Sequence, residues 1–238
     1  MARINLKGEL VSDSDAELMR YFGYNIGFYS PMDIRGALDT LKPGEPLELD
    51  INSIGGLCDA AAEIYSLVQQ ARAAGHQTIA RIQSIAASAA SYLCLACDRI
   101  EMALPAQMMI HNASMWVHGN KDELKHAAQE LNEQDQAILD VYAEKCGEKC
   151  ERSQLEKLMN AETWLRAERC LELGLVDAII GRDVAAPQFD GLVASADNIV
   201  RAMSALPDIA ELRKQKNSAD EWKTAAAAEL KIERSRFE

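Results

Sequence analysis

The sequence lacks any cluster of lysine and arginine that could form a basic patch. Its 238 residues carry a formal net charge of -12, and its pI is near 4.9. A chain with this charge repels the phosphate backbone of DNA or RNA unless a local patch reverses the sign. We therefore expect no nucleic-acid partner.

Long apolar stretches are also missing, because the longest ones are short and broken by charges. None has the roughly 20 apolar residues of a membrane-spanning helix, and Met1 to Asn5 lacks the apolar segment of a secretory signal. The sequence predicts a soluble, cytoplasmic protein without membrane contact. Its length favours one α/β domain with an appendage over two equal domains.

The six cysteines include two pairs with the spacing of metal ligands, Cys94 with Cys97 and Cys146 with Cys150. The first pair falls in an apolar helical run, where free cysteine packs as a small hydrophobe. The second pair lacks nearby histidines and flanks a predicted helix end at Gly147. We expect no metal, no cofactor and, in a reducing cytoplasm, no disulfide.

Strands and helices alternate along the first 180 or so residues. Period-2 and helical patterns predict strands at 4–10, 47–51, 78–82, 99–102 and 108–110, helices at 30–41, 61–71 and 88–97, and a final α/β unit at 155–177. This alternation predicts an α/β fold with a largely parallel sheet.

A long amphipathic helix is predicted from Asn120 to Lys145. Asn120 can cap it together with Glu123, and apolar residues repeat along one face at Leu124, Ala128, Leu131, Ile138 and Tyr142. An exposed apolar stripe on so long a helix indicates a partner.

The composition changes beyond about Gly181, first to Ala-Pro-Gln and then to charge-rich segments. This change predicts a folded domain at 1–181, followed by a linker and a partly helical extension at 182–238.

Three short segments hold residues that could carry chemistry. Ser88 lies among small residues at a predicted strand-to-helix junction, where unpaired helix N–H groups favour negative charge. His111 follows an apolar strand, whose end can hold an imidazole rigidly. Gly55 and Gly56 end another strand, where backbone N–H groups could face an oxyanion.

Each of these segments also has a structural interpretation. Ser84, Ser88 and Ser91 could be helix caps or packing residues, His111 could be structural, and the glycine pair could form a tight turn. The other histidines, His76, His118 and His126, fit turn or solvated positions. Taken separately, none of the three segments decides a function.

Taken in chain order, the segments resemble the ClpP family of serine peptidases. The order is Asn52-Ser53-Ile54-Gly55-Gly56, then Ala87-Ser88-Ala89, then Met109-Ile110-His111, then Gly174-Leu175-Val176-Asp177. The resemblance spans about residues 4–180. It implies a ClpP/crotonase-like fold with a parallel-sheet core and a protruding handle helix, and peptide-bond hydrolysis through an acyl-enzyme.

The resemblance implies that Ser88 is the nucleophile and His111 the general base. Glu162 stands where housekeeping members carry aspartate, so it is the candidate third member, with a surface or helix-capping role as its alternative. The oxyanion hole would use backbone N–H groups of Gly55 or Gly56 and of Ala89.

Ile54 replaces a proline of the housekeeping pattern, Asn112-Ala113 replaces Gln-Pro, and a long tail follows Ile180. These divergent loops, the segment Glu162-Thr163-Trp164 and the tail resemble ClpP-related phage head-maturation proteases. This branch implies capsid, portal or scaffold proteins as substrates and leaves dependence on an ATP-driven unfoldase open. The family also implies a homo-oligomeric ring or double ring that takes polypeptide substrates.

Two other functions stay open. A crotonase-fold enzyme acting on acyl-CoA would bind a thioester with paired backbone N–H groups, without needing Ser88 and His111 together. An inactive homologue would keep the fold only as a structural or scaffolding platform.

Overall fold

A computed structural model describes residues 2–182, so the predicted linker and extension lie outside the described residues except at Arg182. The strands are β1 (Ala2–Leu10), β2 (Phe28–Tyr29), β3 (Leu47–Gly56), β4 (Thr78–Ala87), β5 (Arg99–Met102), β6 (Gln107–Ile110), β7 (Thr163–Arg166) and β8 (Ala178–Ile179). The helices are α1 (Asp13–Tyr21), α2 (Pro31–Leu38), α3 (Cys58–Ala73), α4 (Ala89–Leu93), α5 (Lys121–Cys146), α6 (Arg152–Asn160) and α7 (Ala167–Leu173), with 3₁₀ turns at Cys94–Ala96 and Gly147–Lys149.

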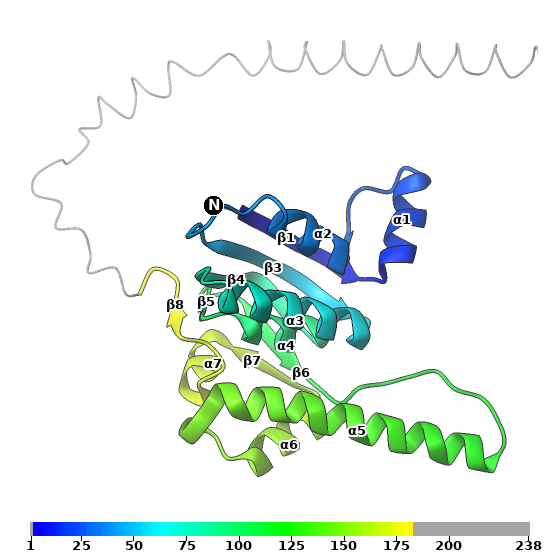
Figure 1. Ribbon diagram of the computed structural model, residues 1–238. Helices are drawn as coiled ribbons and strands as arrows, with labels where there is room; N and C mark the ends of the chain where they lie inside the picture. The colour runs from blue at the N-terminus through cyan, green and yellow to red at the C-terminus, as the bar shows by residue number, and fades with distance from the viewer. Residues whose placement is uncertain (1, 183–238) are drawn as a thin grey trace, which may run out of the picture. The chain divides into compact units, whose positions relative to one another are not determined.

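These strands form one sheet in the order β2-β1-β3-β4-β5-β8, and every pair along this path is parallel (Figure 1). β6 pairs in parallel with the end of β4, and β7 adds an antiparallel pair to β6. The predicted α/β fold with a parallel-sheet core and a long helix is confirmed.

The two faces of the sheet differ in chemistry because side chains alternate along each strand. One face carries buried apolar residues such as Leu49 and Ile82, which join the main core with residues of α3 and α4. On the other face, Arg81 pairs with Glu48 at 2.6 Å and with Glu101 at 3.1 Å. Acidic and basic side chains of neighbouring strands therefore lie opposite one another on this face.

The structure extends β4 beyond the predicted strand at 78–82. The first part of β4 pairs with β5, and Ile85 to Ala87 pair with β6. The predicted helix at 88–97 is correspondingly shorter, since α4 ends at Leu93 and a 3₁₀ turn follows. Ser88 consequently lies directly between a long strand and a short helix.

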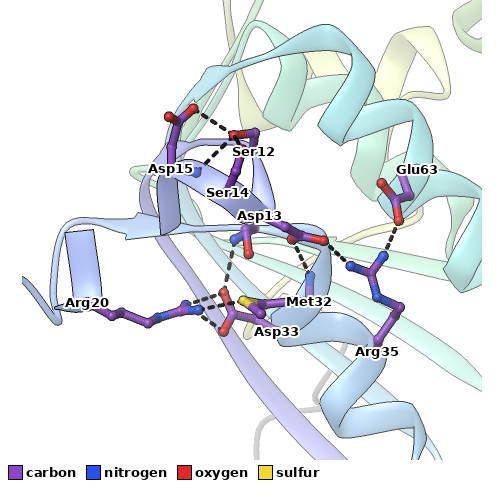
Figure 2. A network of polar contacts seen from close by, with 10 residues as sticks. Ser12, Asp13, Ser14, Asp15, Arg20, Met32, Asp33, Arg35 and Glu63 are labelled. Carbon is purple, nitrogen blue, oxygen red and sulfur yellow. Dashed lines mark hydrogen bonds and ion pairs between the residues drawn. The ribbon is translucent and has the colours of Figure 1, made fainter. Parts of the chain in front are cut away.

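A helix that the apolar pattern did not predict, α1, lies between β1 and β2. Figure 2 shows the polar network that fixes it, in which Arg20 pairs with Asp33 of α2 at 2.7 Å. Arg35 of α2 bonds both to Asp13 of α1 and to Glu63 of α3. The network joins α1 to two helices of the domain. Several large apolar side chains beyond it stay exposed, namely Tyr21, Phe22, Tyr24 and Ile26.

The long helix α5 begins as predicted. The Asn120 side chain accepts hydrogen bonds from the N–H groups of Asp122 and Glu123, and the Glu123 carboxylate accepts one from the N–H of Asn120 at 2.6 Å. Its buried residues are Ala127, Ile138, Leu139, Tyr142 and Cys146, mostly in the second half. Leu124 in the first half is 45% exposed, and Figure 1 shows this half extending beyond the other elements.

Among residues 2–182, no helix is both long and apolar enough to cross a membrane. The same range contains no group of three His, Cys, Asp or Glu side chains arranged to hold a metal ion. Cys94 and Cys97 are buried in the main core, so the first pair packs as apolar side chains do.

We expect the domain to fold without residues 183–238. β8 completes the sheet on β5, the Ile180 N–H donates to Met102 O at 2.9 Å, and Arg182 pairs with Glu168 at 3.0 Å. A chain ending at Arg182 should keep its circular dichroism spectrum and a thermal midpoint within about 3 °C of the full chain. Aggregation or loss of a cooperative transition would contradict this expectation.

Candidate active site

Ser88 occupies a tight turn between β4 and α4. Its φ of 54° and ψ of -129° lie in a region that side chains rarely adopt. Backbone bonds hold it there, because its N–H donates to Met109 O at 2.9 Å and its carbonyl accepts from the Ser91 N–H at 2.9 Å. A conformation that costs energy and is held by neighbours is typical of functional residues.

His111 directly follows β6, the strand that pairs with the end of β4. Because Ala87 is opposite Met109, Ser88 and His111 emerge from adjacent strand ends. A hydrogen bond of 2.7 Å joins His111 Nε2 to Ser88 Oγ. The structure thus brings two of the predicted site residues together, in a geometry that allows the imidazole to take the hydroxyl proton.

Gly55 and Gly56 form the glycine turn at the end of β3, and Gly55 allows it to approach Ser88. A Cβ at Gly55 would lie 2.7 Å from the Ser88 Cβ and 2.9 Å from the Ala89 N, and Gly55 has a φ of 92°. Both observations exclude a larger residue there. The structure therefore places Gly55 and Ala89, two candidate oxyanion-hole residues, beside Ser88.

The N–H of Gly55 already has an acceptor. It donates to Ser53 Oγ at 3.1 Å, and this bond competes with its predicted donation to an oxyanion. Gly56 lies against β1, because a Cβ there would be 2.0 Å from Leu10 O. The choice between Gly55 and Gly56 as donor stays a prediction.

A buried polar network supports this glycine turn and was not predicted from the sequence. Ser53 Oγ donates to Gly8 O at 2.6 Å and is 2.9 Å from the Tyr29 hydroxyl. Both Ser53 and Tyr29 are almost fully buried. Tyr29 belongs to the edge strand β2, so residues far from Ser88 in the sequence hold the turn beside it.

Glu162 lies in a turn just before β7, with a φ of 48°. Since Thr163 pairs with Ile110 in the antiparallel ladder, the backbone of Glu162 adjoins His111. Its side chain is exposed, and within the described part of the chain no hydrogen bond joins its carboxylate to His111. The role of Glu162 as the third member stays a prediction.

A small cavity with room for about one water molecule is lined in part by Ser88 and His111. Its other lining residues are Cys58, Ala89, Tyr92, Ala113, Ile138 and Tyr142. The Tyr92 hydroxyl donates to Cys58 O at 2.6 Å, and the Tyr142 hydroxyl is 2.5 Å from Ser91 Oγ. With these hydroxyls already bonded, the cavity offers a bound group mainly apolar surface.

The Cys58 thiol adds to this apolar character. Burial raises the pKa of Cys58, and the neighbouring carboxylates of Asp59 and Asp135 raise it further. The thiol is therefore neutral at physiological pH and behaves as a small apolar group in the cavity wall.

Comparison with known proteins gives the family of this chain. The family model described as Clp protease matches residues 36–183, which is more than half of the chain. The chain belongs to the Clp protease family. Membership in this family supports a peptidase. Gly55, Gly56, Ser88, His111 and Glu162 all fall inside the matched range.

Curated relatives in the Clp protease family share about a quarter to a third of their residues with this chain. It is 27% identical over 164 residues to the ATP-dependent Clp protease proteolytic subunit 1 of Chlamydia abortus, covering 64% of this chain and 84% of the relative. The protein of the same name from Chlamydia muridarum is 31% identical over 147 residues, covering 60% and 74%. That of Protochlamydia amoebophila is 26% identical over 182 residues, covering 75% and 80%.

The predicted ClpP-family membership is thereby confirmed. The finer resemblance to phage head-maturation proteases stays a prediction. The family match begins inside α2, so β1, α1 and β2 lie outside it.

Proposed function

We propose that this chain is a serine endopeptidase. Ser88 Oγ attacks the carbonyl carbon of a peptide bond while His111 Nε2 takes its proton, and the amine leaves with a proton from the same imidazole. Water then hydrolyses the acyl-enzyme. His111 takes a proton from the attacking water and returns a proton to Ser88 Oγ as the acyl group leaves. The single observation that carries the proposal is the 2.7 Å contact between Ser88 Oγ and His111 Nε2.

The tetrahedral intermediate needs donors for its oxyanion. The Ala89 N–H beside Ser88 would be one donor, and the N–H of Gly55 or Gly56 at the end of β3 the other.

Phage capsid, portal or scaffold proteins are the substrates that we propose. The support is the resemblance in the departures from the housekeeping pattern, namely Ile54, Asn112-Ala113 and the extension after Ile180. The sequence leaves dependence on an ATP-driven unfoldase open, and the matched relatives are named as ATP-dependent proteins.

Labelling with a fluorophosphonate tests the proposed chemistry, because this reagent reacts with activated serine hydroxyls. The label should attach to Ser88 in the full-length protein, as located by peptide mass spectrometry, and Ser88→Ala should remove it. Ser84→Ala is the matched control, since Ser84 is exposed on the same strand. An acyl-CoA enzyme or an inactive scaffold would leave Ser88 unlabelled.

We also propose that the chain assembles into a ring or double ring. The first half of α5 extends beyond the other elements and exposes Leu124. A small domain gains by covering such a surface with another copy. The native mass by light scattering at micromolar concentration should be a multiple of 26.2 kDa. A strictly monomeric protein would contradict this prediction.

A further inference from the structure

The segment 111–120, which begins with His111, connects β6 to α5 and contains no helix or strand. Backbone pairing within the sheet ends at Ile110. The position of the imidazole therefore depends on side chains that hold the next few residues.

Two such contacts hold the start of this segment. The Ala113 N–H donates to Asp135 Oδ1 of α5 at 2.6 Å. One residue earlier, Asn112 Nδ2 donates to Asn160 Oδ1 at the end of α6 at 2.8 Å. The segment is thus connected to two different helices within two residues of His111.

The Asp135 contact is the stronger of the two on physical grounds. A carboxylate acceptor makes a shorter and stronger hydrogen bond than an amide oxygen does. Asp135 and Ala113 are both half-buried, whereas the two asparagines are bonded at an exposed position where water competes. Ala113 also lines the cavity beside Ser88, as does Ile138, one turn after Asp135 on α5.

We propose that Asp135 is a positioning residue for His111. It does not touch the imidazole, and it acts by fixing the backbone two residues beyond it. This keeps Nε2 within hydrogen-bonding distance of Ser88 Oγ. The inference rests on the proposed serine peptidase function and adds to it a residue that the sequence pattern did not indicate.

The size of the expected effect follows from the geometry of proton transfer. A displacement of the base by about 1 Å can lower a rate by roughly 10²-fold. Asp135→Ala removes the acceptor and should lower kcat by about 10- to 100-fold with little change in KM. Asp135→Asn keeps an acceptor oxygen and should stay within about threefold of the wild type.

Hydrogen exchange gives a second measurement that does not depend on catalysis. The Ala113 amide, whose N–H donates to Asp135, should exchange at least about tenfold faster in Asp135→Ala than in the wild type or in Asp135→Asn. Asp140→Ala is the matched control, because Asp140 lies on the same helix, is exposed and, among residues 2–182, pairs with Arg152. It should change neither the exchange nor kcat.

The outcomes separate this inference from the proposed function. Wild-type kcat in Asp135→Ala would overturn the positioning role. Equal losses of kcat in Asp135→Asn and Asp135→Ala, with the Ala113 amide still protected in Asp135→Asn, would also overturn it. The charge of Asp135, and not its acceptor oxygen, would then matter. A wild-type protein that neither hydrolyses peptides nor takes the fluorophosphonate would refute the peptidase proposal, while the exchange rates would still show whether Asp135 holds the segment.

Discussion

Ser88→Ala should abolish peptide hydrolysis and leave the fold intact. In the proposed mechanism the Ser88 hydroxyl oxygen forms the acyl-enzyme, and loss of the nucleophile in a serine peptidase costs about 10⁶ in kcat. Alanine keeps the Cβ that already fits at φ 54°, so the turn is no more strained than before. Hydrolysis of a fluorogenic peptide measures the loss, and a thermal midpoint close to that of the wild type verifies the fold.

A double variant sharpens this test. His111→Ala alone should be nearly as damaging as Ser88→Ala, because the hydroxyl without its base is a weak nucleophile. Combining the two should add almost nothing, since both act in the same step. Additive losses would mean that the 2.7 Å contact between them is not the catalytic one. Normal turnover by Ser88→Ala would refute the nucleophile assignment.

Glu162→Gln should lower kcat by about 10⁴ if Glu162 orients the imidazole, because an amide can hold the ring in the wrong tautomer. The prediction requires the exposed carboxylate to turn toward His111 in the working enzyme. Its place next to Thr163, which pairs with Ile110, makes the two residues neighbours across the ladder. Turnover of a fluorogenic peptide by the assembled protein is the measurement.

Glu156→Gln on α6 is the control, since this glutamate is also exposed but lies a helical turn or more from Glu162 in the sequence. A near-native rate in Glu162→Gln would mean that Ser88 and His111 work as a dyad or that another group orients the ring. The assignments of Ser88 and His111 would survive that result.

The fold could be predicted from the sequence wherever a local pattern determined the structure. Buried parallel strands read as short apolar runs, and the cap at Asn120 with Glu123 marked the start of α5 within one residue. The proximity of Ser88 and His111 was predicted from the family resemblance, which rests on the order of the motifs. In the structure the two residues follow adjacent parallel strands, whose carboxyl ends lie at one edge of the sheet.

The rest depended on contacts between distant segments, which a local pattern cannot show. Nothing in the region around Tyr29 indicates that its hydroxyl meets Ser53, 24 positions later. The partners of Ala113 and of Arg20 are likewise set by how helices pack. Glu162 could be selected by resemblance, but the direction of its side chain depends on a left-handed turn that the sequence does not mark with glycine.

The pairing of β1 with β3 predicts how a protein truncated to the range of the family match would behave. A fragment at 36–183 would retain Ser88, His111 and Glu162, yet it would lose the strand that pairs with β3 along nearly its whole length. The unpaired N–H and C=O groups of β3 would then invite intermolecular association. The glycine turn would also lose Gly8, Leu10 and Tyr29, which surround it. We therefore expect the smallest stable unit to be larger than the segment that matches the family model, because the first 35 residues support β3 and the glycines beside Ser88.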